Sequence, residues 1–299
     1  MARWKQKVGA AGVPLGNGRV LTNVRYADDI MLYAQSADEL ANMLEVLIEE
    51  LAAVGLHLNP DKTKVLTSEE TAGAMFIEVE NNMLKVMSGM DTHKYLGKTL
   101  PANLRDRTTT ELRQRLRRAW QQVHEHRHAL TNQNVSVRLR LKLFQSVVTP
   151  TLFFGLACLP LTKQQLGSLD VIQNKMLRLI VGWKRVDGEE WADTMRRMRD
   201  RVNDALVHFP VDRWSALFCR RLFKLALKSI ASVSDWVHAI IGWRPASTHG
   251  ASRARGRPPT RWDDRLASFT RDILNATSHW TTSISEEDED AFVEYCLQT

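Results

Sequence analysis

Two adjacent aspartates lie inside an apolar, strand-like stretch near the start of the chain, Asn23 to Ala34, with the sequence NVRYADDIMLYA. Burying a charge is costly unless the charge is paired or bound to a metal, so Asp28 and Asp29 restrict how this stretch can fold. Aspartate is favoured in turns because its side chain bonds to nearby backbone groups. We therefore predict two short strands within residues 20–34, joined by a tight turn at Asp28-Asp29.

The segment that follows has the pattern of an amphipathic helix. Ser36 and Glu39 have the spacing of a capping box, and Gly55 is a natural helix stop. Between them, apolar residues recur every three or four positions, which places them on one face of a helix. The stripe consists of Leu40, Met43, Leu44, Leu47, Ile48, Leu51 and Val54.

Three further segments before Pro101 indicate short antiparallel strands. Residues 56–67 predict a strand, a turn at Asn59-Pro60 and a second strand. Residues 76–86, FIEVENNMLKV, predict a hairpin with an Asn-Asn turn, because asparagine tolerates a positive φ. Residues 93–100, HKYLGKTL, predict another short strand pair.

The two ends of the chain and its second half have a different character. Residues 1–19 are rich in glycine and lack periodicity, which predicts an irregular start. Residues 105–142 carry ten Lys or Arg against three Asp or Glu, on patterns typical of helices. The acidic stretch after residue 284 predicts a solvated, frayed tail.

Charge and cysteine usage limit the classes of protein. The net charge of +7 favours a polyanionic partner. The three cysteines, Cys158, Cys219 and Cys296, are far apart and form no C-x-x-C pair. That spacing excludes zinc modules built from cysteine pairs and argues against a disulfide framework, so a reducing, intracellular setting fits best.

The chain offers little sign of a membrane protein or a secreted one. Its first ten residues, MARWKQKVGA, lack the apolar core of a signal peptide. Residues 143–162 carry no charge, but they contain two prolines and three threonines. We therefore predict a buried helix with a break there, rather than a membrane span.

Two carboxylates at a hairpin tip have a clear chemical use. Mg²⁺ prefers oxygen ligands and takes few of them from a protein. Two such ions activate an attacking 3′-hydroxyl and stabilise the leaving oxygen in phosphoryl transfer. The alternative for Asp28 and Asp29 is a turn in which they only cap a hairpin.

Residues 24–66 resemble the palm of a reverse transcriptase of the type encoded by non-LTR retrotransposons. Tyr26-Ala27-Asp28-Asp29 matches the catalytic hairpin of that family. The helix and the following GLHLNPDKTK (residues 55–64) match the next palm motif, and YLGKTL (95–100) matches the hairpin that grips the primer end. Less specific likenesses continue in residues 139–183, which resemble the helical thumb, and in GRPPTRWDD (256–264).

The resemblance implies a role for each matching residue. Asp28 and Asp29 would be the catalytic, metal-binding carboxylates. Lys62, with Lys64 as its rival, would protonate the pyrophosphate leaving group. The residues implied to lie against the primer strand are Tyr26, Ala27, Tyr95, Leu96, Gly97 and Lys98. On the basic helix, Arg113 and Arg117 are candidates for contacts with a phosphate backbone.

The resemblance also implies an activity, cofactors and partners. The intact enzyme would be an RNA-directed DNA polymerase, a nucleotidyltransferase that uses Mg²⁺ or Mn²⁺. Its partners would be an RNA template, a DNA primer and deoxynucleoside triphosphates. We expect it in the nucleus or cytoplasm, without a membrane.

One departure from the family bears on activity. Polymerases of this class need a third carboxylate, on an earlier palm strand, and also the fingers. Only 25 residues precede Tyr26, and the first 23 contain no Asp or Glu. We therefore expect the C-terminal part of a polymerase, inactive by itself. The alternatives are a nucleic-acid-binding protein without catalysis and a non-functional relic.

The expected fold class is α+β. An antiparallel palm remnant with one packed helix would precede an all-helical thumb and C-terminal region. The expected segments are a ragged N-terminal segment (1–19), a partial palm (20–101), a helical thumb (102–185), a C-terminal helical region (186–243), and an Arg/Pro-rich linker with an acidic tail (244–299).

Overall fold

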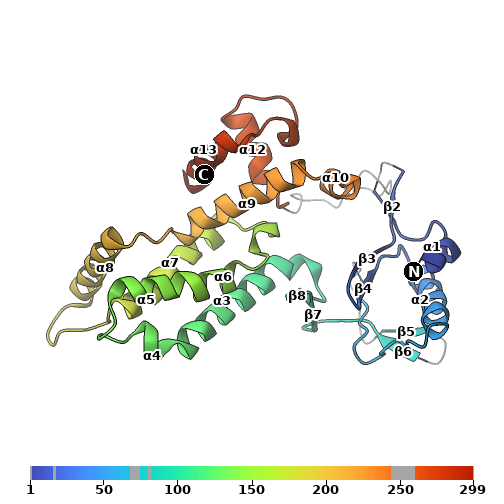
Figure 1. The fold of residues 1–299 in the computed structure, drawn as a ribbon, viewed down its shortest axis with the longest axis horizontal. Helices are drawn as coiled ribbons and strands as arrows, with labels where there is room; N and C mark the ends of the chain where they lie inside the picture. Colours follow the sequence, from blue (N-terminus) through green and yellow to red (C-terminus); the bar gives the residue numbers. More distant parts are fainter. Residues whose placement is uncertain (1, 16–17, 68–74, 80–81, 244–259, 299) are drawn as a thin grey trace. The chain divides into compact units, whose positions relative to one another are not determined.

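The computed structural model describes residues 2–15, 18–67, 75–79, 82–243 and 260–298 (Figure 1). The chain forms two compact units, and the α+β class is confirmed. The first, called here the mixed unit, consists of Met1–Glu111 and Ser232–Arg257. The second, the helical unit, consists of Leu112–Ala231 and Pro258–Thr299.

All strands of the described residues pair as sequence neighbours in two-stranded antiparallel sheets. This arrangement needs only local turns, so each sheet is a hairpin. The four pairs are β1 (Val13–Pro14) with β2 (Val20–Leu21), β3 (Asn23–Tyr26) with β4 (Asp29–Leu32), β5 (Phe76–Val79) with β6 (Asn82–Lys85), and β7 (Thr92–Tyr95) with β8 (Lys98–Pro101).

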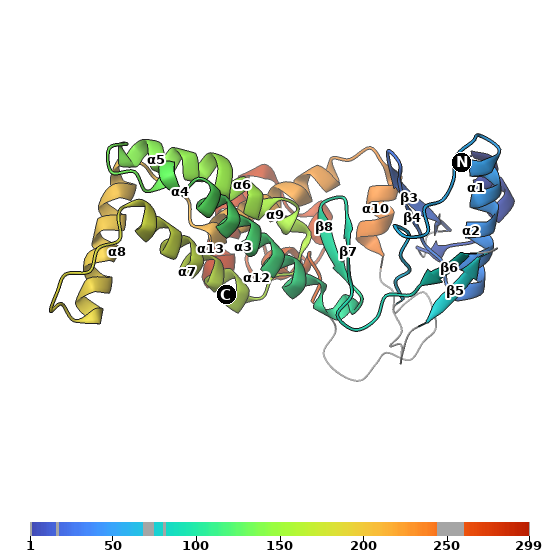
Figure 2. The same ribbon diagram turned by 90° about the horizontal axis from the view of Figure 1, so that it is seen from below.

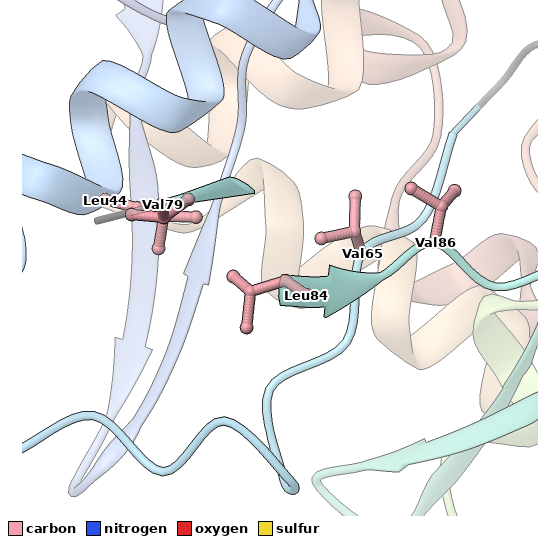
Figure 3. Close-up of a cluster of buried hydrophobic side chains, with 5 residues drawn as sticks. All are labelled: Leu44, Val65, Val79, Leu84 and Val86. Atoms are coloured by element: carbon pink, nitrogen blue, oxygen red, sulfur yellow. The ribbon is translucent and has the colours of Figure 1, made fainter. Parts of the chain in front are cut away.

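Helix α2 (Ala37–Ala52) organises the mixed unit, as its apolar stripe predicts. The hydroxyl of Ser36 accepts a hydrogen bond from the backbone N–H of Glu39 at 3.1 Å, which confirms one half of the predicted capping box. The other half does not form, because the Glu39 carboxylate accepts from the backbone N–H groups of Gln35 and Gly12 instead. Figure 3 shows Leu44 of α2 beside Val79 of β5. A buried apolar cluster joins α2 to the β5–β6 hairpin and contains Leu44, Val65, Val79, Leu84 and Val86.

The prediction of an irregular N-terminal segment is wrong. Residues Ala2–Val8 form a helix, α1, which lies against α2 (Figure 1). The side chain of Trp4 is fully buried, and its Nε1 donates a hydrogen bond to the backbone oxygen of Met43 at 2.9 Å. In so short a helix, Trp4 and Val8 give a single i,i+4 repeat, too little for a periodic signal.

Residues 56–67 depart partly from the prediction. The turn is present, with Asn59 Oδ1 accepting from the backbone N–H of Lys62 at 3.2 Å. The two flanking strands do not form, and Val65 makes only a single bridge, to Val86. A strand needs a partner for its backbone groups, and Leu56–Asn59 finds none in the described part of the chain.

The hairpin predicted over residues 76–86 is confirmed as β5–β6. Val79 pairs with Asn82, so Asn82 belongs to the strand and the two joining positions are 80 and 81. These two positions lie outside the described residues, and so does the turn conformation that was predicted for them.

A helix from late in the sequence completes the mixed unit. Helix α10 (Asp235–Gly242) lies against the N-terminal segment, where Asp235 pairs with Arg19 at 2.7 Å. The ring of Trp236 lies 5.4 Å from the Arg19 guanidinium, a favourable cation–π distance. Residues about 200 positions apart in sequence therefore stabilise one another.

The helical unit contains one long helix, whose first residues belong to the mixed unit, and a group of other helices. The long helix, α3, starts at Arg107 and runs to Glu125. The other helices are α4 (Arg127–Leu130), α5 (Val137–Leu143), a π-helical turn (Phe144–Val148), α6 (Thr149–Phe153), α7 (Lys163–Ile180), α8 (Trp191–His208), α9 (Trp214–Ile230), α12 (Asp264–Asp272) and α13 (Glu289–Gln298). This group is packed on α9 and α7.

Trp214 lies at the centre of the helical unit. Its side chain is fully buried, stacked on Phe144 with ring centroids 5.7 Å apart and against the edge of Phe153. The indole Nε1 donates to Thr149 Oγ1 at 3.3 Å, and the backbone N–H donates to Gln173 Oε1 at 2.9 Å. One side chain thus joins α9 to α6 and α7.

The apolar segment 143–162 is a helix with a break, as predicted. The run through α5 and α6 ends at Phe153, and Gly155 takes a left-handed conformation with φ 63°. Among the described residues, Val137–Cys158 is long and apolar enough to cross a membrane, with a mean hydropathy of 1.4. The core helix of a soluble protein passes the same test, and Phe144 and Leu152 are fully buried here.

The prediction of a solvated, frayed tail after residue 284 is wrong for the described residues 285–298. Helix α13 buries Phe292, Val293 and Cys296 and packs along α9 (Figure 1). Its acidic residues Glu289 and Asp290 lie in the first turn, where negative charge complements the helix dipole. The acidic residues that predicted a loose tail therefore lie at the start of a helix.

The start of α8 is held by a carboxylate whose ionisation makes stability depend on pH. Arg197 and Thr194 donate to Glu189 at 2.7 Å each, and these bonds lower the pKa of Glu189 to about 2, from an ordinary 4.5. Because the pKa of Glu189 is lower in the folded state, its ionised carboxylate stabilises the fold at any pH above about 4.5, the ordinary pKa. This contribution is lost as the pH falls from there toward 2. We expect Glu189→Gln to destabilise the protein at pH 6 and to have a smaller effect at pH 3, as measured by urea unfolding at both values. An equal effect at both pH values would contradict this linkage.

Candidate functional site

The β3–β4 hairpin presents the two aspartates at its tip. Tyr26 pairs with Asp29, so the two-residue turn is Ala27 and Asp28. The predicted turn at Asp28-Asp29 is therefore wrong by one residue, and Asp29 is the first residue of β4. Strand pairing sets this register and places Ala27 in the left-handed region, at φ 53°, which is uncommon for a residue other than glycine.

The tip is open to solvent and carries uncompensated negative charge. Tyr26, Ala27, Asp28 and Asp29 are all exposed. Neither carboxylate has a hydrogen-bond or ion-pair partner within the described ranges. Two adjacent, solvated carboxylates repel each other, and a cation placed between them relieves that repulsion.

The second predicted hairpin, β7–β8, is confirmed. Tyr95 pairs with Lys98, and the turn residues Leu96 and Gly97 have φ values of 46° and 74°. Two positive φ angles in a two-residue loop define a type I′ turn, which matches the twist of the strands. The turn thus holds Tyr95 and Lys98 side by side at the strand ends.

Tyr95, at the tip of β7–β8, responds to a charge on the other hairpin. Its hydroxyl is buried and has no hydrogen-bond partner in the described structure. Burial raises the pKa of Tyr95, and the nearby charge of Asp29 raises it further. The charge at the tip of β3–β4 thus lies within electrostatic range of the phenol at the tip of β7–β8.

Tyr33 belongs to the same neighbourhood and was missed by sequence reasoning. Burial raises the pKa of Tyr33, and Tyr95 contributes to the rise. Its hydroxyl donates to Met31 Sδ at 3.0 Å. Successive side chains of a strand alternate in direction, so Asp29, Met31 and Tyr33 were identifiable as one face of the chain.

The two candidate lysines, Lys62 and Lys64, are exposed side chains. Lys62 lies on the turn that Asn59 stabilises. The charge of Lys64 helps lower the pKa of Asp91, where the larger causes are the Lys85 ammonium and the Ser88 N–H. Neither lysine makes a hydrogen bond or ion pair with Asp28 or Asp29.

Glu111 is a second residue that sequence reasoning missed. Its carboxylate is buried, and Oε2 accepts from the backbone N–H of Thr99 at 2.7 Å. This bond ties β8 to the first turns of α3. The candidates Arg113 and Arg117 follow on α3, are exposed, and lie one helical turn apart on the same face.

At the β3–β4 tip, the groups that could bind a metal ion are the carboxylates of Asp28 and Asp29. In the described ranges, no group of three or more His, Cys, Asp or Glu side chains is placed to hold a metal ion. Asp28 and Asp29 supply the oxygen ligands that Mg²⁺ prefers, and this ion commonly completes its shell with water and phosphate oxygens. The pair thus fits a divalent ion as a partial site.

Comparison with known proteins finds a related family over the first third of the chain. Residues 3–100 match the family model described as reverse transcriptase (RNA-dependent DNA polymerase). An uncharacterized transposon-derived protein of Caenorhabditis elegans is 28% identical over 282 residues, which cover 91% of this chain and 95% of the relative. No solved structure matches the chain. The chain therefore contains a reverse transcriptase-like segment, and its sequence is related over most of its length to that of a transposon-derived protein.

Proposed function

We propose that this chain carries the metal-binding and primer-contacting hairpins of an RNA-directed DNA polymerase of the non-LTR retrotransposon type. It binds the end of a primer–template hybrid but does not catalyse synthesis by itself. The observation that carries the proposal is that the charge of Asp29, at the tip of one hairpin, acts on Tyr95 at the tip of the other.

Each hairpin contributes a distinct part. Asp28 and Asp29 would hold Mg²⁺ or Mn²⁺, and the bound ion would supply Lewis-acid activation of a 3′-hydroxyl and of a phosphate. Tyr95 and Lys98, at the tip of β7–β8, would lie against the primer strand. The hydroxyl of Tyr95 is buried, so the exposed turn residues Leu96 and Gly97 would make the outer contacts with that strand.

The proposed lack of synthesis is based on the number of carboxylates available to bind metal ions. The reaction in this family depends on three carboxylates acting together, and the described residues place two at the tip. Groups that act as a unit are non-additive, so the absence of one costs several orders of magnitude in rate. Both deoxynucleoside triphosphate and template would be positioned by parts of a polymerase other than these hairpins.

A primer-extension assay tests the proposal. We expect the purified chain, with an RNA template, a DNA primer and deoxynucleoside triphosphates, to give no extended product in Mg²⁺ or Mn²⁺. A competent reverse transcriptase under the same conditions controls for the substrates. Template-dependent extension by the wild type that is absent in Asp28→Asn would show a complete active site and refute the proposed inactivity.

A second candidate function is nucleic-acid binding without a metal. It is favoured by the exposed face of α3, where Arg113 and Arg117 are followed along the same face by Gln121 and His124. Trp120 is half-buried, with its ring 6.1 Å from that of His124. Such a face tracks a phosphate backbone without reading sequence, and its affinity falls steeply with salt.

A further inference from the structure

The helical unit contains a cavity that the proposed function does not use. It has a volume of about 290 Å³ and lies among the first turn of α5, Val181 directly after α7, and the last turns of α8. Figures 1 and 2 both show α8 at one end of this unit, beside these two helix ends. Arg138, Arg201, Asp204 and His208 line it, with Val181 and Phe209 forming part of an apolar wall.

Three of the polar side chains have unused hydrogen-bonding capacity. Arg138, Asp204 and His208 make no hydrogen bond or ion pair with any other described residue. A guanidinium presents a planar fork of N–H donors whose geometry matches phosphate or carboxylate oxygens. The cavity thus offers a donor fork, an imidazole and a carboxylate, all available to a ligand.

Arg201 is held in place by the end of α7. Its Nη2 donates to the backbone oxygen of Val181 at 2.9 Å. Beside it, the buried Arg140 donates to the backbone oxygens of Ile180 and Val135. An arginine fixed by one bond keeps other N–H donors for a ligand, and little entropy is lost when the ligand binds.

The volume of the cavity and the charges of its lining side chains limit the class of ligand that it can bind. A cavity of this volume is at the small end of ligand sites, so it suits one nucleotide better than a larger molecule. Inorganic phosphate would leave the apolar wall unused. An acidic peptide would place its carboxylates near Asp204, where like charges repel.

We propose that this cavity binds a nucleoside phosphate. The phosphate pairs with Arg138 and Arg201, the base packs against Val181 and Phe209, and Asp204 accepts a hydrogen bond from an amino group of the base. Cytosine suits this last position because its exocyclic amine donates to carboxylates. The site lies wholly in the helical unit and does not depend on Asp28 and Asp29, so it can fail or hold independently of the proposed function.

Calorimetric titration of the full chain with cytidine 5′-monophosphate tests this proposal. EDTA is present throughout, so metal-dependent binding at the β3–β4 tip does not contribute. We expect the nucleotide to bind and the nucleoside cytidine to bind at least about tenfold more weakly, because charge-assisted bonds to the phosphate are lost. A cytidine trinucleotide that binds more tightly than the monophosphate identifies a strand as the source, and equal affinity identifies a free nucleotide.

Variants locate the binding. Arg138→Gln removes an exposed guanidinium without a described partner, so it should leave the fold intact and weaken nucleotide binding at least about fivefold. Asp204→Asn should weaken cytidine monophosphate and leave uridine monophosphate less affected, since uracil lacks the exocyclic amine. Arg185→Gln is the matched control and should change nothing, because Arg185 is an exposed arginine of the same unit that does not line the cavity. Absence of nucleotide binding, equal affinity for nucleotide and nucleoside, unchanged affinity in Arg138→Gln, or equal affinity for an acidic peptide would each overturn the proposal.

Discussion

Replacing Trp214 with alanine is expected to lower the free energy of unfolding of the helical unit by about 4 kcal/mol, the usual range for a buried large aromatic. The side chain is fully buried between Phe144 and Phe153, and its removal leaves a cavity that helices from three parts of the sequence cannot close. It also leaves Thr149 without the indole donor. Urea unfolding followed by circular dichroism measures the loss.

Trp191→Ala is the matched control in the same unit. Trp191 is 57% exposed and lies at the first position of α8. Surface substitutions usually change stability by about 0.5 kcal/mol or less, so this variant should unfold close to the wild type. A loss from Trp214→Ala no larger than that from Trp191→Ala would contradict the assigned core.

The second large effect is expected on Mn²⁺ binding, when Asp28→Asn is combined with Asp29→Asn. We expect the wild type to bind one Mn²⁺ at the hairpin tip and the double variant to lose that binding, as measured by electron paramagnetic resonance titration. An amide oxygen is a neutral and weaker ligand, and the mutual repulsion that a cation relieves disappears with both charges. Both side chains are exposed, so the fold should be unaffected.

A second pair of adjacent carboxylates controls for charge alone. Glu286 and Glu287 are exposed, next to each other and far in sequence from the tip. Replacing both with glutamine changes net charge by the same amount as the aspartate variant. If this control abolishes Mn²⁺ binding equally, or if the aspartate variant retains it, the tip is not the metal site.

Elements with strong local signals could be predicted from sequence. Helix α2 combines a cap at Ser36 with a long apolar stripe, and β7–β8 has a glycine at a turn position that needs a positive φ. In both, the local preference of the backbone agrees with the tertiary fold. The β3–β4 hairpin was located less exactly, because its turn is Ala27-Asp28 and Ala27 has a positive φ that its residue type does not favour.

Elements that depend on distant partners could not be predicted. Helix α1 is short, and its burial relies on the bond from Trp4 to Met43. In α13 the apolar positions Phe292 and Cys296 gain meaning only against α9. Residues 56–59 have strand-like alternation, but alternation does not supply the neighbouring strand that pairing requires.

In the candidate site, too, some features have local sequence signals and others depend on distant contacts. Local motifs identify Asp28, Asp29 and Tyr95, but they do not show that Tyr95 lies near Asp29 or that its hydroxyl lacks a partner. Glu111 anchors β8 through a backbone hydrogen bond, and a carboxylate inside a basic helix gives no sequence signal for such a role. Tertiary contacts of this kind are set by packing, which the sequence pattern does not specify.

The most direct test of the proposed joint site is the effect of Mn²⁺ on primer–template affinity. Fluorescence anisotropy of a labelled DNA primer on an RNA template is measured in Mn²⁺ and in EDTA, for the wild type and for Asp28→Asn with Asp29→Asn. If metal and primer share one site, Mn²⁺ tightens binding by the wild type at least about fivefold and has no effect on the double variant. An equal effect of Mn²⁺ on both proteins, or on neither, would contradict a joint site at the two hairpins.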